Sequence, residues 1–161
     1  MKHSSIPKVR KAALKDLPIL KKFVLGLIQV ELPMDSTIKE DTSTYYDLNE
    51  LIQSSESDVF VVELDTKIVA SGYAKIIDDK PYLKHDKQGY LGFMFVPEDY
   101  RGHGFNKLIL DALFKWCKER SVFEIRLDVY DKNTAAIKAY VKAGFKKNML
   151  NMRMNIKELD I

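Results

Sequence analysis

The chain has 161 residues, of which 46% are hydrophobic and 30% are charged, which is ordinary for a globular protein with one proper core. The formal net charge of +3 is too small to argue for nucleic-acid binding, which needs basic side chains clustered on one face. No apolar run is long enough to cross a membrane, and the first five residues have no apolar signal core. We therefore predict a single cytoplasmic domain over residues 1–161.

The N-terminal part of the chain predicts one short strand and two helices. Residues 9–12 are expected to form the strand, after which Asp16 has the character of an N-cap and Pro18 falls in the first helical turn. Apolar side chains then recur on one helical face, which predicts a helix that runs to about residue 30. Residues 31–35 interrupt this pattern, and a second helix is predicted over residues 44–53.

A β-hairpin and a further strand come next. Residues 59–64 and 68–77 are rich in β-branched and aromatic side chains, and the residues between them have turn character. A polar loop over residues 78–89 leads to a strand over residues 90–96. Gly92 in this strand suits either a close approach by another backbone or a simple packing requirement.

The segment after this strand is the most informative part of the chain. It contains Arg101-Gly102-His103-Gly104 and continues into a helix whose apolar residues share one face. The start of a helix exposes unpaired backbone N–H groups at the positive end of its dipole. Two glycines let a ligand approach the backbone, and Arg101 and Lys107 add positive charge. We therefore predict an anion-binding loop, suited to a pyrophosphate. Walker A and Gly-x-Gly-x-x-Gly sequences are both absent from the chain.

The C-terminal part predicts two more strands and a helix. Apolar and charged residues alternate over 123–129, as in a half-exposed strand. Asn133 is expected to cap a helix over residues 134–143, which Gly144 ends. Residues 149–156 are predicted to form a last strand. Together the predicted elements indicate a mixed sheet flanked by helices.

Two segments resemble the GNAT superfamily of acetyl-CoA-dependent N-acetyltransferases. The superfamily's loop reads Arg/Gln-x-x-Gly-x-Gly/Ala, which Arg101 and Gly104 match and from which Asn106 departs. The second segment has Asn133, then Tyr140 on a helix, and then Gly-Phe. The resemblance implies an α/β fold (an α+β mixed sheet). Its central, mostly antiparallel sheet would be splayed at the cofactor strand and flanked by helices.

The resemblance also implies a set of binding and catalytic residues. The loop would bind the phosphates of acetyl-CoA, and the N–H near Met94 would hold the acetyl carbonyl oxygen. Tyr140 would protonate the departing CoA thiolate, and Asn133 lies about 20° from it around the helix. No metal ligand is implied. The cofactor-binding set comprises Met94, Phe95, Val96, Arg101, Gly102, His103, Gly104, Phe105, Asn106, Lys107, Asn133 and Tyr140.

The general base is left open by the sequence. An acceptor amine must be neutral to attack, so a base or a water chain is expected. Some relatives carry Glu where this chain has Tyr90, and a phenol is a poor base at neutral pH. Glu31 and Asp35 lie on the side where the resemblance implies the acceptor, and His85 lies in the loop before the cofactor strand. His103 flanks the phosphate loop and is not expected to act as the base.

The predicted function is transfer of an acetyl group from acetyl-CoA to a primary amine by direct attack in a ternary complex. No Cys or Ser nucleophile with a paired His is evident, and the single Cys117 is interpreted as a small buried hydrophobic residue. The acceptor is expected to be a small molecule or a peptide, and a homodimer is compatible with the family. The alternatives are a non-catalytic acyl-CoA-binding module and an interaction protein that reuses the fold without cofactor.

Overall fold

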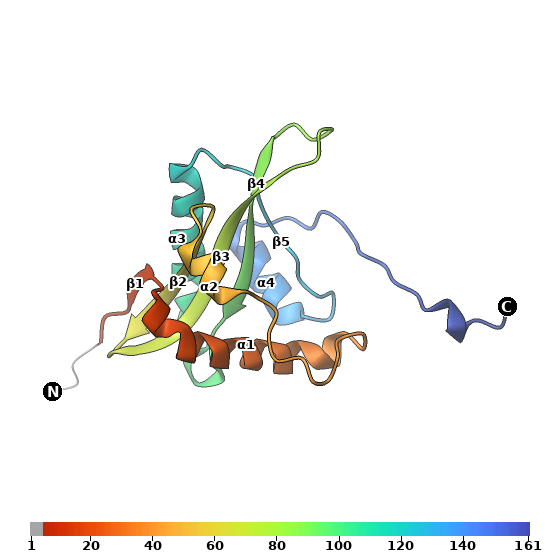
Figure 1. Ribbon diagram of the computed structural model, residues 1–161, viewed down its shortest axis with the longest axis horizontal. Helices are drawn as coiled ribbons and strands as arrows, with labels where there is room; N and C mark the ends of the chain where they lie inside the picture. The colour runs from red at the N-terminus through yellow and green to blue at the C-terminus, as the bar shows by residue number, and fades with distance from the viewer. Residues whose placement is uncertain (1–4) are drawn as a thin grey trace. The chain divides into compact units, whose positions relative to one another are not determined.

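The computed structural model describes residues 5–161, which form two compact units (Figure 1). The first unit ends at Tyr130 and the second comprises Asp131–Ile161. Most of the N-terminal segment in which we predicted no signal core lies outside the described residues. No helix among residues 5–161 is long and apolar enough to cross a membrane.

The first unit is built on a five-stranded mixed sheet in the order β1-β2-β3-β4-β5. The first four strands pair antiparallel, and β5 pairs parallel to β4. This arrangement confirms the predicted mostly antiparallel mixed sheet. The strands are β1 (Lys8–Lys11), β2 (Ser57–Leu64), β3 (Lys67–Asp78), β4 (Lys87–Phe95) and β5 (Ile125–Leu127).

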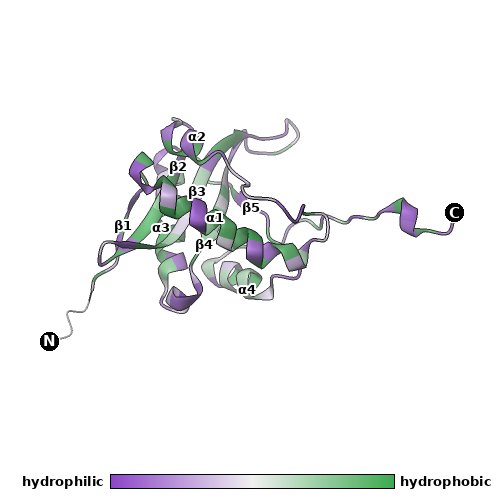
Figure 2. Cartoon of the chain, turned by 60° about the horizontal axis from the view of Figure 1, so that its bottom comes forward, coloured by the Kyte–Doolittle hydropathy of each residue, from purple (hydrophilic) through white to green (hydrophobic). Residues whose placement is uncertain are grey.

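Helices cover both faces of this sheet (Figure 1). On one face, α1 (Leu17–Glu31) and α2 (Leu48–Gln53) share a buried cluster with Val59, Tyr73 and Phe93. On the other face lies α3 (Phe105–Glu119), whose Ile109 and Leu113 side chains pack against the sheet at Gly72. Apolar residues concentrate on the strands (Figure 2), because the sheet is buried between the helices.

Trp116 fixes α3 to β2 through both apolar and polar contacts. Its side chain is 2% exposed, and its Nε1 donates a hydrogen bond to Asp58 Oδ2 at 2.7 Å. The Arg120 guanidinium lies 3.9 Å from the centre of the indole ring, in a cation–π arrangement. The buried indole N–H is therefore satisfied, and its ring is covered by charge on the solvent side.

The predicted β2–β3 hairpin is confirmed, while two predicted strands have shifted ends. The β2–β3 connection is a two-residue turn in which Asp65 has φ 48° and Thr66 has φ 68°. Positive φ at both central residues is the geometry of the type I′ hairpin turn. The first strand lies one residue earlier than predicted, and β4 begins at Lys87, before the predicted position 90.

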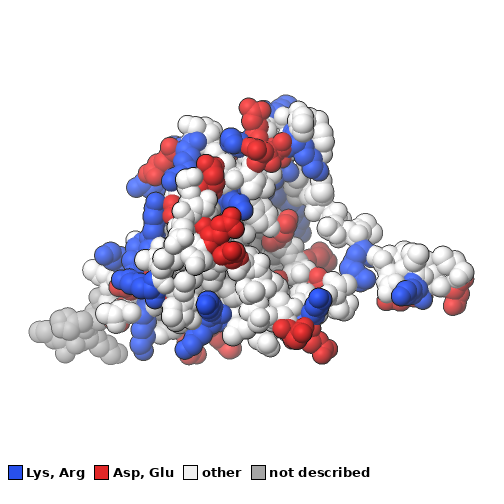
Figure 3. Space-filling model, viewed as in Figure 1, with Lys and Arg blue, Asp and Glu red and all other residues white. Residues whose placement is uncertain are grey.

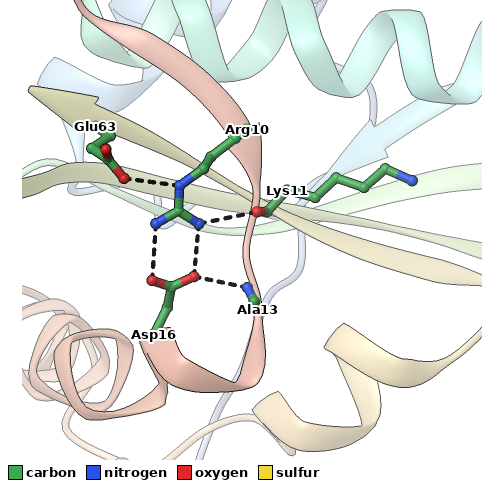
Figure 4. Close-up of polar contacts among 5 residues, drawn as sticks. All are labelled: Arg10, Lys11, Ala13, Asp16 and Glu63. Carbon is green, nitrogen blue, oxygen red and sulfur yellow. Dashed lines mark hydrogen bonds and ion pairs between the residues drawn. The ribbon is translucent and has the colours of Figure 1, made fainter. Parts of the chain in front are cut away.

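Asp16 precedes α1 as predicted, but its side chain does not cap that helix. Its carboxylate accepts two hydrogen bonds from the Arg10 guanidinium, at 2.8 and 3.0 Å, and one from the Ala13 N–H at 2.8 Å (Figure 4). The Arg10 Nε donates to Glu63 Oε2 at 2.9 Å. The bidentate Arg10 contact holds the pKa of Asp16 below its usual range. Asp16 therefore joins β1 to the start of α1.

The second helix is shorter than predicted. It begins at Leu48 instead of position 44, because the Asp47 side chain caps it by accepting a hydrogen bond from the Glu50 N–H at 3.0 Å. Residues 44–46 precede this cap and are not helical. Tyr45 and Tyr46 therefore lie in the segment before the helix.

The second unit contains one regular helix, α4 (Thr134–Ala143). Its predicted ends are confirmed, because Asn133 Oδ1 accepts a hydrogen bond from the Ala136 N–H at 3.2 Å and Gly144 has φ 109°. The predicted last strand over residues 149–156 is wrong. This segment is extended but pairs with no strand of the described chain, and a single turn of 3-10 helix follows at Ile156–Glu158.

The predicted strand over residues 123–129 is also shorter in the structure, where β5 covers three residues. Phe123, at the start of the predicted strand, is 74% exposed. Alternation of apolar and polar residues indicates an extended backbone, but a strand also needs a partner whose N–H and C=O groups are free.

Charged side chains of both signs are interspersed on the face of the molecule shown in Figure 3. Neighbouring positive and negative charges weaken one another's field at a distance, so that face has no broad potential of one sign.

Candidate active site

The segment between β4 and α3 forms a loop that contains two glycines and leads directly into α3. Glu98–Tyr100 makes one 3-10 turn, and α3 begins directly after Gly104. Gly102 and Gly104 both have φ 79°, a left-handed conformation that favours glycine. A Cβ added at either position would meet no atom within 4 Å, so open space lies beside both glycines.

Six consecutive backbone N–H groups in this loop and helix start are free. Among residues 5–161, none of the N–H groups of residues 102–107 makes a hydrogen bond of standard geometry. The first internal bond comes from Leu108 N–H to Gly104 O, at 3.2 Å. Free N–H groups at the positive end of a helix, beside open space, are the arrangement that binds phosphate groups. The geometry therefore fits the predicted anion-binding loop.

The side chains of the loop hold its shape and leave the donors accessible. The exposed Arg101 donates from Nε to Val96 O at 3.0 Å, which ties the loop to the end of β4. His103 Nδ1 lies 3.1 Å from Tyr100 O, and the imidazole ring stacks on the ring of Phe105. Phe105 itself is 7% exposed and anchors the first turn of α3. The Lys107 ammonium lies 2.6 Å from Asp111 Oδ2, on the helix surface.

The part of β4 that leads into this loop has one edge without a paired strand in residues 5–161. The pairing of β4 with β5 covers Gly89–Leu91, so the backbone beyond Leu91 has no partner strand on that side among residues 5–161. The β3–β4 register shifts between Ser71 and Tyr73, and Phe93 has φ 56° at this bulge. Met94, Phe95 and Val96, the predicted pantetheine positions, follow the bulge. A free strand edge can pair with an extended ligand.

Gly92 has a packing role. An added Cβ there would lie 2.4 Å from the Tyr73 ring, so only glycine leaves room for that tyrosine. Of the two interpretations of Gly92, the structure supports the packing requirement.

The second predicted segment lies on α4. The Tyr140 ring packs edge-on against Phe145, with ring centres 5.7 Å apart. The Asn133 side chain is engaged in its cap, as described above. The expected roles of Asn133 and Tyr140 toward acetyl-CoA stay predictions.

The four candidate bases lie in different surroundings. His85 precedes β4, while the loop at residues 101–104 follows its other end, and nine strand residues span roughly 30 Å. Its Nε2 lies 2.6 Å from Asp79 Oδ2, in an orientation that does not meet hydrogen-bond geometry. The Tyr90 hydroxyl donates to Asp128 Oδ2 at 2.9 Å. Burial and this carboxylate raise the pKa of Tyr90 far above neutrality, so it stays a phenol.

Glu31 and Asp35 lie together at the end of α1. The Asp35 N–H donates to Glu31 O at 3.2 Å, and Asp35 Oδ2 accepts from the Tyr130 hydroxyl at 3.0 Å. Burial and the nearby Asp35 charge raise the pKa of the Glu31 carboxyl. Burial together with the Asp35 hydrogen bond raises the pKa of Tyr130 to about 12.

A group of tyrosines near these carboxylates was not predicted from the sequence. The Tyr46 ring lies 5.4 Å from the Tyr73 ring and 5.5 Å from the Phe93 ring, measured between ring centres. Tyr130 reaches Asp35 from a position 95 residues further along the chain. The only sequence signal was the number of tyrosines, eight, which does not show that they converge.

Comparison with known proteins agrees with this geometry. The Acetyltransferase (GNAT) family model matches residues 27–145. An N-alpha-acetyltransferase of Sulfurisphaera tokodaii is 32% identical over 108 residues, which are 64% of this chain and 65% of that protein. N-alpha-acetyltransferase 30 of Saccharomyces cerevisiae is 29% identical over 80 residues, 50% of this chain and 46% of that protein. The matched region spans less than two thirds of either relative.

Solved structures show the same fold. A mutant protein from Bacillus halodurans has a TM-score of 0.84 at 23% identity, covering 92% of this chain and 98% of that one. A "predicted acetyltransferase with acetyl-CoA" from Clostridium acetobutylicum has a TM-score of 0.72 at 24% identity, covering 97% and 100%. The family match spans the loop predicted to bind an anion, the open edge of β4 and the helix that carries Tyr140. This chain belongs to the GNAT family of acetyltransferases.

Proposed function

We propose that the chain transfers the acetyl group of acetyl-CoA to a primary amine of a small molecule or a peptide in the cytoplasm. The observation that carries the proposal is the row of six free backbone N–H groups at residues 102–107, beside two glycines that leave open space. The relative from Clostridium acetobutylicum was solved with acetyl-CoA, and the two matched relatives are named as N-alpha-acetyltransferases.

In this proposal the loop, the edge of β4 and Tyr140 have separate roles. Acetyl-CoA supplies the activated acetyl group. The loop N–H groups and Arg101 bind its phosphates, and the free edge of β4 from Met94 to Val96 binds the pantetheine arm. The N–H near Met94 stabilises the carbonyl oxygen as negative charge develops on it. Tyr140 donates its proton to the leaving thiolate.

Direct attack by the amine is favoured over an acyl-enzyme route. Cys117, the single cysteine, is 0% exposed, and burial raises the pKa of its thiol to about 11. A buried thiol that stays protonated is a poor nucleophile.

The test has two steps. Calorimetric titration with acetyl-CoA measures binding, and a thiol-reactive dye then measures CoA release with benzylamine, 1,4-diaminobutane and a short peptide with a free N-terminus. We expect both binding and amine-dependent CoA release. Binding without release would support the non-catalytic acyl-CoA-binding module, and absence of binding would contradict the proposal altogether.

A further inference from the structure

Glu31 is a half-buried carboxylate without a partner. Its side chain makes no hydrogen bond and no ion pair with any residue that the structure describes, and burial raises its pKa. Charged groups removed from water are usually paired with a donor or a cation, because desolvation is costly. Among the described residues, Glu31 therefore lacks the cationic partner that such a carboxylate usually has.

The groups that surround Glu31 come from four parts of the first unit and include no positive charge. Burial, and after it the Asp35 charge, raise the pKa of Glu31. Burial also raises the pKa values of four nearby phenols, to which the Glu31 charge adds a smaller contribution. The hydroxyl oxygen of Tyr45 is buried and has no hydrogen-bond partner among the described residues. The groups that face Glu31 are Asp35 after α1, Tyr45 and Tyr46 before α2, Tyr90 on β4 and Tyr130 after β5.

The residues around Glu31 also place it near the unpaired edge of β4. Ile28, three residues earlier on α1, is 1% exposed and belongs to the same buried cluster as Phe93. Residues three apart lie on the same helix face, so Glu31 continues this face beyond the core. Tyr46 contacts Phe93, at the bulge where the β4 edge opens. Glu31 therefore lies at the side of β4 on which the acetyl group is proposed to bind.

We propose that Glu31 accepts the proton of the acceptor's ammonium group, so that the site takes primary amines that are cationic in solution. This inference rests on the proposed acetyl transfer. The carboxylate attracts the ammonium group, and the tyrosine rings add cation–π attraction. Neutral or anionic acceptors lack both of these attractions.

In the proposed reaction the ammonium nitrogen gives up two protons and gains the acetyl group. An N–H bond of the ammonium breaks and its proton passes to the Glu31 carboxylate. The freed nitrogen lone pair forms a bond to the thioester carbonyl carbon, and the C–S bond breaks with its electron pair on sulfur. The thiolate takes the proton of Tyr140. The nitrogen still carries two protons after the attack and loses one of them to solvent as the amide forms, while solvent restores the proton of Tyr140. Glu31 then loses its proton to water. The products are an acetamide and CoA.

The experiment compares Glu31→Gln with a matched control, Glu40→Gln, which changes an exposed carboxylate in the segment after α1. Calorimetry measures acetyl-CoA affinity, and kcat is measured against pH with the best amine of the panel. For Glu31→Gln we expect acetyl-CoA affinity within about twofold and a kcat lower by about 10²–10⁴-fold at neutral pH. The deficit should shrink as pH rises, because more of the amine is then neutral in solution. Glu40→Gln should match the unmodified protein.

Two further measurements separate a proton acceptor from a structural side chain. Glu31→Asp keeps a carboxylate at shorter reach and should restore part of kcat together with the original pH profile. Aniline is neutral at neutral pH, so its acetylation should be far less sensitive to Glu31→Gln than that of benzylamine.

A Glu31→Gln protein with unchanged kcat and pH profile would overturn this inference and leave the proposed function standing. An equal loss with aniline and benzylamine, or loss of acetyl-CoA binding in Glu31→Gln, would also overturn it, because Glu31 would then act on the fold. If the unmodified protein binds no acetyl-CoA or releases no CoA with any amine of the panel, the proposed function fails and the inference fails with it.

Discussion

The Tyr140 hydroxyl has one proposed task, which is to protonate the leaving thiolate. Tyr140→Phe keeps the ring and its packing against Phe145 and deletes only the proton donor. We expect kcat to fall by about 10²–10⁴-fold while acetyl-CoA affinity changes little. The measurement is kcat against pH for both proteins. A Phe variant with near-normal kcat at every pH would leave Tyr140 with a packing role alone.

Glu31 should have opposite effects on stability and on the proposed chemistry. Its pKa is raised in the folded state, so folding favours the protonated carboxyl. The corresponding stabilisation is fully present below the unfolded pKa of about 4.3 and is lost as pH rises through the folded pKa. Once the pH exceeds the folded pKa, the unmodified protein therefore contains a partly buried charge that Glu31→Gln removes.

We expect Glu31→Gln to have a higher Tm than the unmodified protein at neutral pH and the same Tm near pH 4. Thermal denaturation at the two pH values checks this, with Glu40→Gln as the control that should shift at neither. A Glu31→Gln protein that is less stable at neutral pH would show that the carboxylate has a favourable partner in the folded state.

At the scale of an element, the start of α3 depends on the left-handed conformation of Gly104. A non-glycine residue at a φ of this sign costs roughly 1–2 kcal/mol, and a branched side chain would also occupy the space beside the free N–H groups. Gly104→Val should therefore lower both stability and acetyl-CoA affinity, the latter by at least about tenfold if the phosphate loses even one charge-assisted bond.

Gly144→Val is the matched control for that change. Gly144 also has a positive φ and open space beside it, but it ends α4 and lies outside the loop. It should lose comparable stability and keep its acetyl-CoA affinity in calorimetry. Equal loss of affinity in both variants would show that strain, and not the loop, weakens binding.

The contrast between the elements that the sequence predicts and those that it misses has a physical cause. The ends of α4 were predictable because Asn133 and Gly144 act on backbone groups within the same helix. The last strand was not, because alternation over residues 149–156 fixes an extended backbone but no partner. Asp16 was misjudged for a related reason, since Arg10 offers it a stronger contact than the helix does.

The candidate site likewise has one part that was predictable from the sequence and one part that was not. The geometry of the loop at residues 101–107 was predictable because its glycines, its free N–H groups and its helix are consecutive in the chain. Anion binding by this loop stays a prediction. The surroundings of Glu31 were not, because Tyr46, Tyr90 and Tyr130 are brought together only by the sheet and the helices that cover it. Glu31 was one of several equal candidates in the sequence, and its burial without a partner distinguishes it in the structure.

At the scale of the whole molecule, the C-terminal segment exposes an unusual amount of apolar surface. Seven large apolar side chains in the last thirteen residues are between 43% and 98% exposed: Met149, Leu150, Met152, Met154, Ile156, Leu159 and Ile161. Exposed apolar residues gathered in one segment favour association and lower solubility. They contribute little to stability, because they bury little area.

We expect the double variant Met152→Lys with Met154→Lys to raise the concentration at which the protein stays monodisperse, with Tm changed by less than about 2 °C. Light scattering after size exclusion and thermal denaturation measure the two quantities. A large fall in Tm would show that these side chains are buried in the folded protein in solution. An exposed uncharged position elsewhere, such as Asn49 on α2, gives a control site for added charge through Asn49→Lys.

Trp116 is the only tryptophan in the chain, and it lies in the first unit at the contact between α3 and β2. Its buried indole makes intrinsic fluorescence a label-free reporter of that contact, while residues 131–161 contribute no tryptophan emission at all. Far-ultraviolet circular dichroism, in contrast, records α4 together with the rest of the helices. Superimposable denaturation curves from the two signals would mean that the chain unfolds as one cooperative domain, and a dichroism change that precedes the fluorescence change would mean that α4 melts on its own.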